Sequence, residues 1–268
     1  MYYLTSTLLH EVVTLKKFLG LLRKEWVLYR SWWLAAIVVS LIFIYCGEYF
    51  LNQRTDIADP RVIFTIWVLI LGTFFVAIQF LASIHNDLKT KEIWLHSTSS
   101  IVQLVGVKII FSLTCSMIFL AFFSVIGLFP SQDFIEATFM QMSFLHFVTV
   151  AIFFTMQCML ILIALLFLVL NVYLKKRFGR FAFIISLGIF ILLMKLWTKF
   201  YESSSYAKIL YHGEISTDGL AAYLPQSDGS SFFIIMGPFY VVEGLAYIIG
   251  YLLLYVVATK WLEKVVLR

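Results

Sequence analysis

Six long apolar runs, separated by short polar gaps, constrain this chain more than any other feature of its sequence. A helix needs about 20 mostly apolar residues to cross the hydrocarbon core of a bilayer. We therefore predict an all-α, polytopic membrane protein. Its six transmembrane helices are expected at residues 32–51, 62–84, 109–129, 144–172, 181–198 and 232–258. The fifth run is the shortest and contains Lys195, whose long stem can reach the interface.

The composition argues against a soluble domain. Of the 268 residues, 62% are apolar and 13% are charged, whereas soluble domains have about 45–50% apolar and about 25% charged residues. The net charge is +5, but the basic residues gather in the gaps between apolar runs, so we expect no nucleic-acid partner. Cys46, Cys115 and Cys158 all lie inside apolar runs, without the spacing of a disulfide framework or a metal site.

The basic residues divide unequally between alternate gaps. Residues 1–31, the second and fourth gaps and the C-terminal tail hold 15 Lys and Arg, and the rest of the chain holds 5. Basic residues favour the cytoplasmic side of a membrane. We therefore expect both termini in the cytoplasm of a plasma membrane. The predicted divisions are a tail with an amphipathic helix (1–31), a transmembrane domain (32–258) and a cytoplasmic tail (259–268).

The segment before the first run is amphipathic at helical spacing. One face is apolar and the other is basic, which is typical of a helix that lies in the membrane interface and contacts lipid headgroups. The alternative is a cytoplasmic helix packed on a partner. The residues that define the two faces are Lys16, Lys17, Phe18, Leu22, Arg23, Lys24 and Trp26.

The second gap, residues 84–108, indicates a compact helical element rather than a slack linker. Residues 92–95 suit a short helix, and the hydroxyl side chains of residues 97–100 interrupt it. Ser100 is expected to cap a further helix together with Gln103, in the pattern of a capping box. The alternative is a plain connector.

The sequence contains no phosphate-binding loop, no H-E-x-x-H and no G-x-S-x-G. We therefore predict no enzyme, no catalytic residue, no metal site and no cofactor bound by this chain. Polar residues inside apolar runs are functional candidates. We single out Glu243 and Gln157 as residues of a translocation path. The alternatives for Glu243 are a pair with Lys195 or a hydrated or hydrogen-bonded position near the outer interface. The alternative for Gln157 is that, like Gln79, it joins two helices.

The order of these elements resembles the permease subunits of ABC-2 type ABC transporters. The local match runs from Lys89 to Lys108, with Thr98 where the family usually has Pro, and Leu21–Trp26 resembles the start of such permeases. The resemblance implies an elbow helix before the first span and a coupling helix in the second gap. The residues that would contact an ATPase are Lys89, Glu92, Trp94, Leu95, Ser97 and Ser100.

The resemblance also implies a function. The chain would form the path of a bacterial exporter for an amphipathic peptide, an antimicrobial or a lipid, in a dimer with a second permease chain, identical or related. A separate cytosolic ABC ATPase would bind ATP and Mg²⁺. Two alternatives remain open, an ATP-independent carrier or channel and a non-transporting immunity or sensor subunit.

Overall fold

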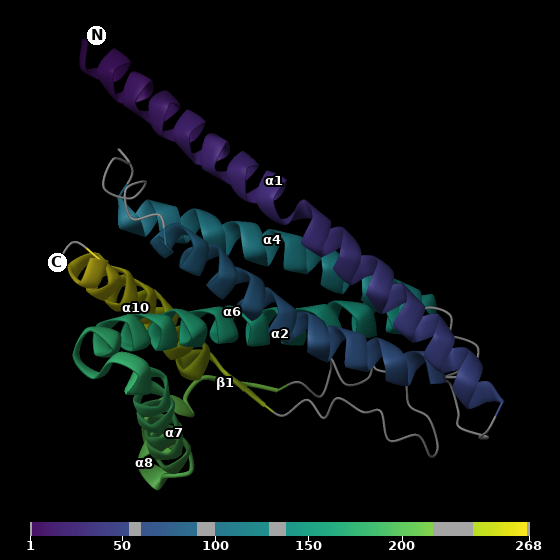
Figure 1. The fold of residues 1–268 in the computed structure, drawn as a ribbon. Coiled ribbons are helices and arrows are strands. Elements are labelled where there is room, and N and C mark those ends of the chain that lie inside the picture. Colours follow the sequence, from purple (N-terminus) through teal and green to yellow (C-terminus); the bar gives the residue numbers. More distant parts are fainter. Residues whose placement is uncertain (1, 54–59, 90–99, 129–137, 217–237, 267–268) are drawn as a thin grey trace.

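The computed structural model describes residues 2–53, 60–89, 100–128, 138–216 and 238–266, and for residues 2–15 it describes the helix but not the side chains. Nearly all of this part is helical (Figure 1). The elements are α1 (Tyr2–Asn52), α2 (Pro60–Lys89), α4 (Ile101–Leu128), α6 (Phe139–Phe178), the 3-10 turn η2 (Gly179–Phe181), α7 (Ala182–Tyr201), α8 (Ser204–Leu210), β1 (Glu214–Ile215), β2 (Phe239–Tyr240) and α10 (Val241–Val266).

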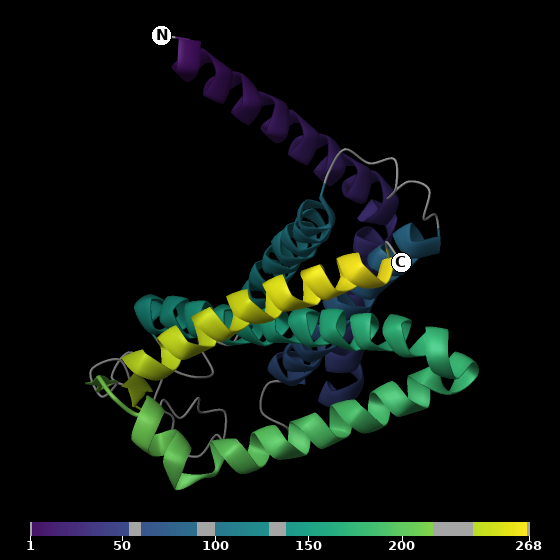
Figure 2. The ribbon, with the colours of Figure 1, turned by 90° about the vertical axis from the view of Figure 1, so that its left-hand side faces the viewer.

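Within the described residues, five helical runs are long and apolar enough to cross a membrane. This confirms the all-α class and the multi-pass character expected from the apolar runs. One of the five, Phe139–Tyr201, is 63 residues long and contains α6, η2 and α7. Figure 2 shows α7 folding back beside α6 after η2. Gly179 permits this turn because its φ of 54° lies in the left-handed region that glycine adopts without strain.

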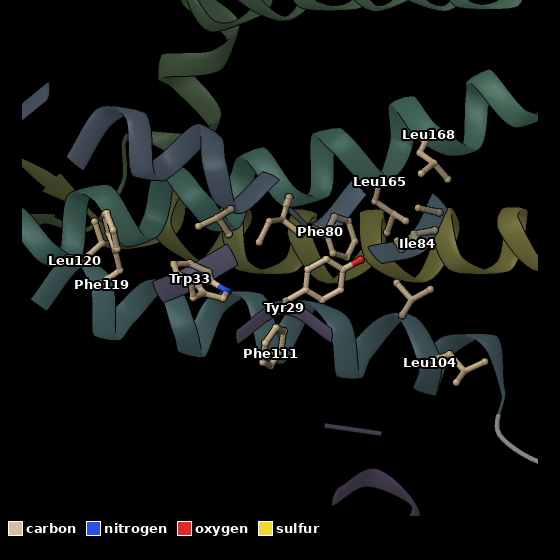
Figure 3. Close-up of a cluster of buried hydrophobic side chains, with 14 of the residues drawn as sticks. Tyr29, Trp33, Phe80, Ile84, Leu104, Phe111, Phe119, Leu120, Leu165 and Leu168 are labelled. Atoms are coloured by element: carbon tan, nitrogen blue, oxygen red, sulfur yellow. The ribbon is translucent and has the colours of Figure 1, made fainter. Parts of the chain in front are cut away.

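The core lies where α1, α2, α4 and α6 meet. Tyr29 and Trp33 of α1 are buried among side chains such as Phe80 of α2, Phe111 of α4 and Leu165 of α6 (Figure 3). By contrast, α7 packs mainly against α6 and η2 and stays exposed along most of its length. The other described residues therefore leave most of the apolar surface of α7 uncovered.

Several predicted span boundaries differ from the helix ends observed, and two of them are informative. The boundary at 31/32 is not a helix end, because α1 runs unbroken from Tyr2 to Asn52. The last helix begins at Val241 rather than at residue 232. Pro238 stands before it, and Phe239–Tyr240 pair antiparallel with Glu214–Ile215, so these residues are committed to a short ribbon before the helix starts.

The ends of the helices alternate along the bundle. Toward one end of the bundle lie the start of α1, the end of α2, the start of α4, the turn at η2 and the end of α10. Toward the other end lie the start of α2 and the end of α4 (Figure 1). Of the 15 basic residues on the richer side of the charge distribution, the 13 that the structure describes belong to segments that lead to the first end. The placement of that end in the cytoplasm stays a prediction from the charges.

Candidate functional site

A buried ion pair joins α1 to α4. The Nζ of Lys108 lies 2.6 Å from Oε1 of Glu25, and each residue is only 3% exposed. Glu25 shares a face of α1 with Tyr29 and Trp33, at intervals of four residues, and this face packs into the core. Lys108 lies two turns into α4. The pair therefore sits at the edge of the apolar core rather than on the molecular surface.

Two residues of α2, one turn apart, complete the site. Asp87 Oδ2 lies 2.9 Å from the Lys108 ammonium. Ser83 Oγ lies 2.5 Å from the same Nζ and donates a hydrogen bond of 2.7 Å to Glu25 Oε2. Lys24, which is 40% exposed, contacts the other Asp87 oxygen at 3.1 Å. We call Lys24, Glu25, Ser83, Asp87 and Lys108 the ion network.

The ion network is balanced in both charge and hydrogen bonds. Two cations face two carboxylates, so its formal charge is zero. An ammonium has three N–H donors, and Lys108 meets Glu25, Asp87 and Ser83 with them. Burying an ion costs several kcal/mol unless its partners and hydrogen bonds are well placed. Because the compensation is mutual, loss of one member leaves a buried charge without its partner.

The ion network flanks residues 90–99. Asp87 lies two residues before the end of α2, and α4 begins just after Ser100. The predicted capping box is confirmed here: Gln103 N–H donates to Ser100 Oγ at 3.3 Å, and Ser100 N–H donates to Gln103 Oε1 at 3.3 Å. Both sides of residues 90–99 are thus attached to well-anchored helices.

The C-terminal helix is attached at the same place. Tyr255 OH of α10 donates to the carbonyl of Val102, in the first turn of α4, at 2.8 Å. A Cβ at Gly106 would lie 2.9 Å from that hydroxyl, so glycine permits the close approach. Lys176 at the end of α6 donates to the carbonyl of Val265 at 2.7 Å. The helix ends on this side therefore form a connected set.

Most of the predicted coupling residues, Glu92, Trp94, Leu95 and Ser97, lie outside the described residues. Lys89 is the last residue of α2, and Ser100 caps α4. In the predicted elbow segment Lys16, Lys17 and Arg23 are exposed, Phe18 and Leu22 are partly buried, Trp26 is 51% exposed and Lys24 joins the ion network. Only part of the predicted apolar face therefore packs inside this chain.

Further polar side chains continue inward from the ion network. On α2 Gln79 lies one turn before Ser83, and on α4 Ser112 lies one turn after Lys108. The Ser112 hydroxyl donates to Gln79 Oε1 at 2.9 Å, and both residues are fully buried. One turn further, Ser116 donates to Oε1 of Gln157 on α6. We call Gln79, Ser112, Ser116 and Gln157 the polar ladder.

The polar ladder is not fully satisfied. The Nε2 atoms of Gln79 and Gln157 are buried and have no hydrogen-bond partner among the described residues. Gln157 was predicted for a translocation path, and the structure places it in the packed interior between α4 and α6. A polar contact of this kind joins helices, and a role of Gln157 in a translocation path stays a prediction.

Glu243, the second predicted path residue, is hydrogen-bonded outside the polar ladder. Its Oε1 accepts a hydrogen bond of 2.5 Å from the hydroxyl of Tyr206 on α8, and Tyr247 lies 3.0 Å from the same hydroxyl. Glu243 stands in the first turn of α10, where the helix dipole favours a carboxylate. Burial, followed by the hydrogen bonds to Glu243 and Tyr247, raises the pKa of Tyr206. The contact holds α8 on α10.

Sequence reasoning missed the ion network. Lys108 was counted as a cytoplasmic charge, Glu25 entered only through a resemblance, and Asp87 was part of a gap. One signal was present: Gln79, Ser83 and Asp87 repeat at four-residue spacing on α2, as Lys108, Ser112 and Ser116 do on α4. Two polar rows of this kind in neighbouring helices can face each other.

No family model, curated protein or solved structure matches this chain.

Proposed function

We propose that this chain is the membrane-spanning permease subunit of an ABC exporter, with six spans in which α6 and α7 cross the membrane separately. It works as a dimer beside a cytosolic ABC ATPase, which binds ATP and Mg²⁺. The ion network is the observation that supports the proposal most. Residues 90–99 lie between two helices that a buried, charge-balanced cluster joins to α1.

Such an arrangement suits transmission of force. If an ATPase displaces residues 90–99, the flanking ends of α2 and α4 move with them. Glu25 then moves together with Lys108 and Asp87, because separating buried opposite charges costs several kcal/mol. A displacement at the cytoplasmic surface thereby reaches α1. An amphipathic peptide, an antimicrobial or a lipid is the substrate class that such an exporter would move.

The first test separates binding of an ATPase from its stimulation. The chain is purified from its host membrane, and a copurifying ATPase with a phosphate-binding loop is sought. We expect Glu92→Ala with Trp94→Ala to abolish the complex. We expect Glu25→Gln to keep the complex and to lose substrate-stimulated ATP hydrolysis, because the contact surface is intact and its connection to α1 is weakened. Glu263→Gln, in an exposed pair with Lys260 on α10, is the matched control.

The result also decides between the alternatives. Full stimulation in the Glu25→Gln complex contradicts the role of the ion network, and an intact complex in the double variant contradicts the assignment of residues 90–99. Transport by vesicles that contain this chain without any ATPase indicates the carrier. A complex that hydrolyses ATP but moves no substrate in either direction indicates the immunity or sensor subunit.

A further inference from the structure

Helix α7 carries two positive charges that the described part of the chain does not neutralise. Lys195 and Lys199 are both exposed, and neither forms an ion pair with a described residue, Glu202 directly after the helix included. They lie four residues apart and so share one face. An ammonium in or near a bilayer is costly unless an anion or water meets it. The surroundings of α7 must therefore supply one of these.

The same face is hollowed and has two chemically different halves. The groove is lined by Phe190, Ile191, Met194, Lys195, Thr198 and Lys199. Along the helix axis the apolar side chains come first and the cationic ones follow, over a distance of about 14 Å at 1.5 Å per residue. The occupant must therefore be an amphiphile with an anionic end, aligned with the helix.

The two lysines lie toward the far end of α7. Measured from Ala182 at the start of α7, Lys195 lies about 20 Å and Lys199 about 26 Å along the helix, and the hydrocarbon core of a bilayer is about 30 Å thick. Trp197, which lies between them, is 46% exposed, as suits an aromatic residue at the membrane interface. A lysine near the end of a span can extend its stem toward the headgroups.

We propose that this groove binds an anionic phospholipid, with its phosphate between Lys195 and Lys199 and an acyl chain along Met194, Ile191 and Phe190. A lipid fits better than an acidic side chain of a second copy, because a phospholipid has the observed order of apolar and anionic groups along the helix axis.

The test uses the full chain in mild detergent with phosphatidylglycerol or phosphatidylcholine as the probe. Native mass spectrometry counts the lipids retained and gives their apparent affinity. Wild type should retain phosphatidylglycerol selectively. Lys195→Gln with Lys199→Gln should bind it about 30-fold more weakly, since each cation near a membrane surface contributes about a fivefold factor. Lys195→Arg with Lys199→Arg should bind as wild type does.

Lys208→Gln is the matched control, because Lys208 is an exposed lysine of α8 outside the groove. Equal retention by wild type and the double glutamine variant overturns the proposal. Equal affinity of wild type for the two lipids also overturns it, and this measurement needs no variant to fold. Loss of self-association in the glutamine variant with unchanged lipid retention assigns the lysines to a second copy instead. The site is independent of the ATPase, so its failure leaves the exporter proposal untouched.

Discussion

The ammonium of Lys108 on α4 and the carboxylate of Glu25 on α1 are 83 residues apart in sequence and 2.6 Å apart in space, and both are almost completely buried. Because the pair belongs to a neutral cluster, the stability lost on mutation depends on which member of the cluster is replaced.

Replacing Lys108 by Met should destabilise the protein by about 3–5 kcal/mol, because Glu25 and Asp87 remain buried with too little positive charge. Lys24→Met is the matched control. Lys24 contacts the same Asp87 but is 40% exposed, so we expect a loss of about 1 kcal/mol or less. Thermal unfolding of the purified variants in detergent measures both. Similar losses for the two variants would contradict the asymmetry inferred from burial.

The double variant Lys108→Met with Glu25→Gln should be more stable than the sum of its single changes predicts. Each single change leaves a charge without its partner, and the double change removes both charges. We expect a coupling energy in the range of about 0.5–3 kcal/mol that contacting residues show. A double-mutant cycle on unfolding temperature gives this number. Strict additivity would mean that the two side chains do not interact in the membrane.

Gln79 and Ser112 should respond differently to removal of a polar group. The Gln79 Nε2 atom has no described partner, so Gln79→Met removes an unsatisfied donor. It also removes the acceptor of the Ser112 hydroxyl, but a serine in a helix can donate to the carbonyl four residues earlier instead. The change in stability should therefore be about 1 kcal/mol or less. Ser112→Ala takes away the hydroxyl that Gln79 Oε1 accepts from and should cost about 1–3 kcal/mol. The unfolding temperatures of the two variants test this order. A larger loss of stability for Gln79→Met than for Ser112→Ala would contradict the hydrogen-bond pattern.

Gly127 is expected to tolerate no side chain. A Cβ there would lie 2.0 Å from Oγ1 of Thr65, where α4 meets α2. Gly127→Ala should therefore cost about 1–3 kcal/mol through overpacking. Gly188→Ala, in the middle of α7 with no atom within 4 Å of the added Cβ, is the control. It should stabilise the helix slightly, by up to about 1 kcal/mol. Equal unfolding temperatures for the two variants would exclude this close packing.

The contact between Tyr206 and Glu243 should make stability fall in alkaline solution. The pKa of Tyr206 is raised in the folded protein, chiefly by burial. The stabilisation is present below the pKa of about 10 of the unfolded tyrosine and is lost as pH rises above it, because only the unfolded chain then releases the proton. Tyr206→Phe should lower the unfolding temperature at pH 8, and the gap to wild type should narrow above pH 10. A gap that widens with pH would contradict the sign.

Hydropathy predicted the helices of the bundle well because it measures which segments avoid water. It located helix ends less well, because helix ends depend on local chemistry. Ser100 with Gln103 carried that chemistry in the sequence, and the cap was predicted correctly. The start of α10 depended instead on Phe239 and Tyr240 pairing with β1, a contact across more than 20 residues that local sequence does not encode.

The candidate site was harder to predict for the same reason. Counting charges used Lys108 only as an indication of the cytoplasmic side, because the sequence does not show which residues contact its ammonium. Glu25 looked like part of a surface helix because hydropathy reads α1 as two segments. Glu243 was predicted as an isolated intramembrane carboxylate, but its partner Tyr206 lies outside the predicted spans, where the sequence gives no sign of the contact. Contacts between helices that are distant in sequence can be identified only when the tertiary packing is known.

Because α1 is one unbroken helix, a rotation of the helix at the ion network displaces both of its ends. From Glu25 the helix extends about 35 Å to Tyr2 and about 40 Å to Asn52, at 1.5 Å per residue. A rigid helix held at that point behaves as a lever with nearly equal arms. A tilt of about 10° at Glu25 moves both ends by about 6 to 7 Å in opposite directions, by the same helix geometry. A rotation of α1 at the ion network is thereby magnified at both ends of the helix.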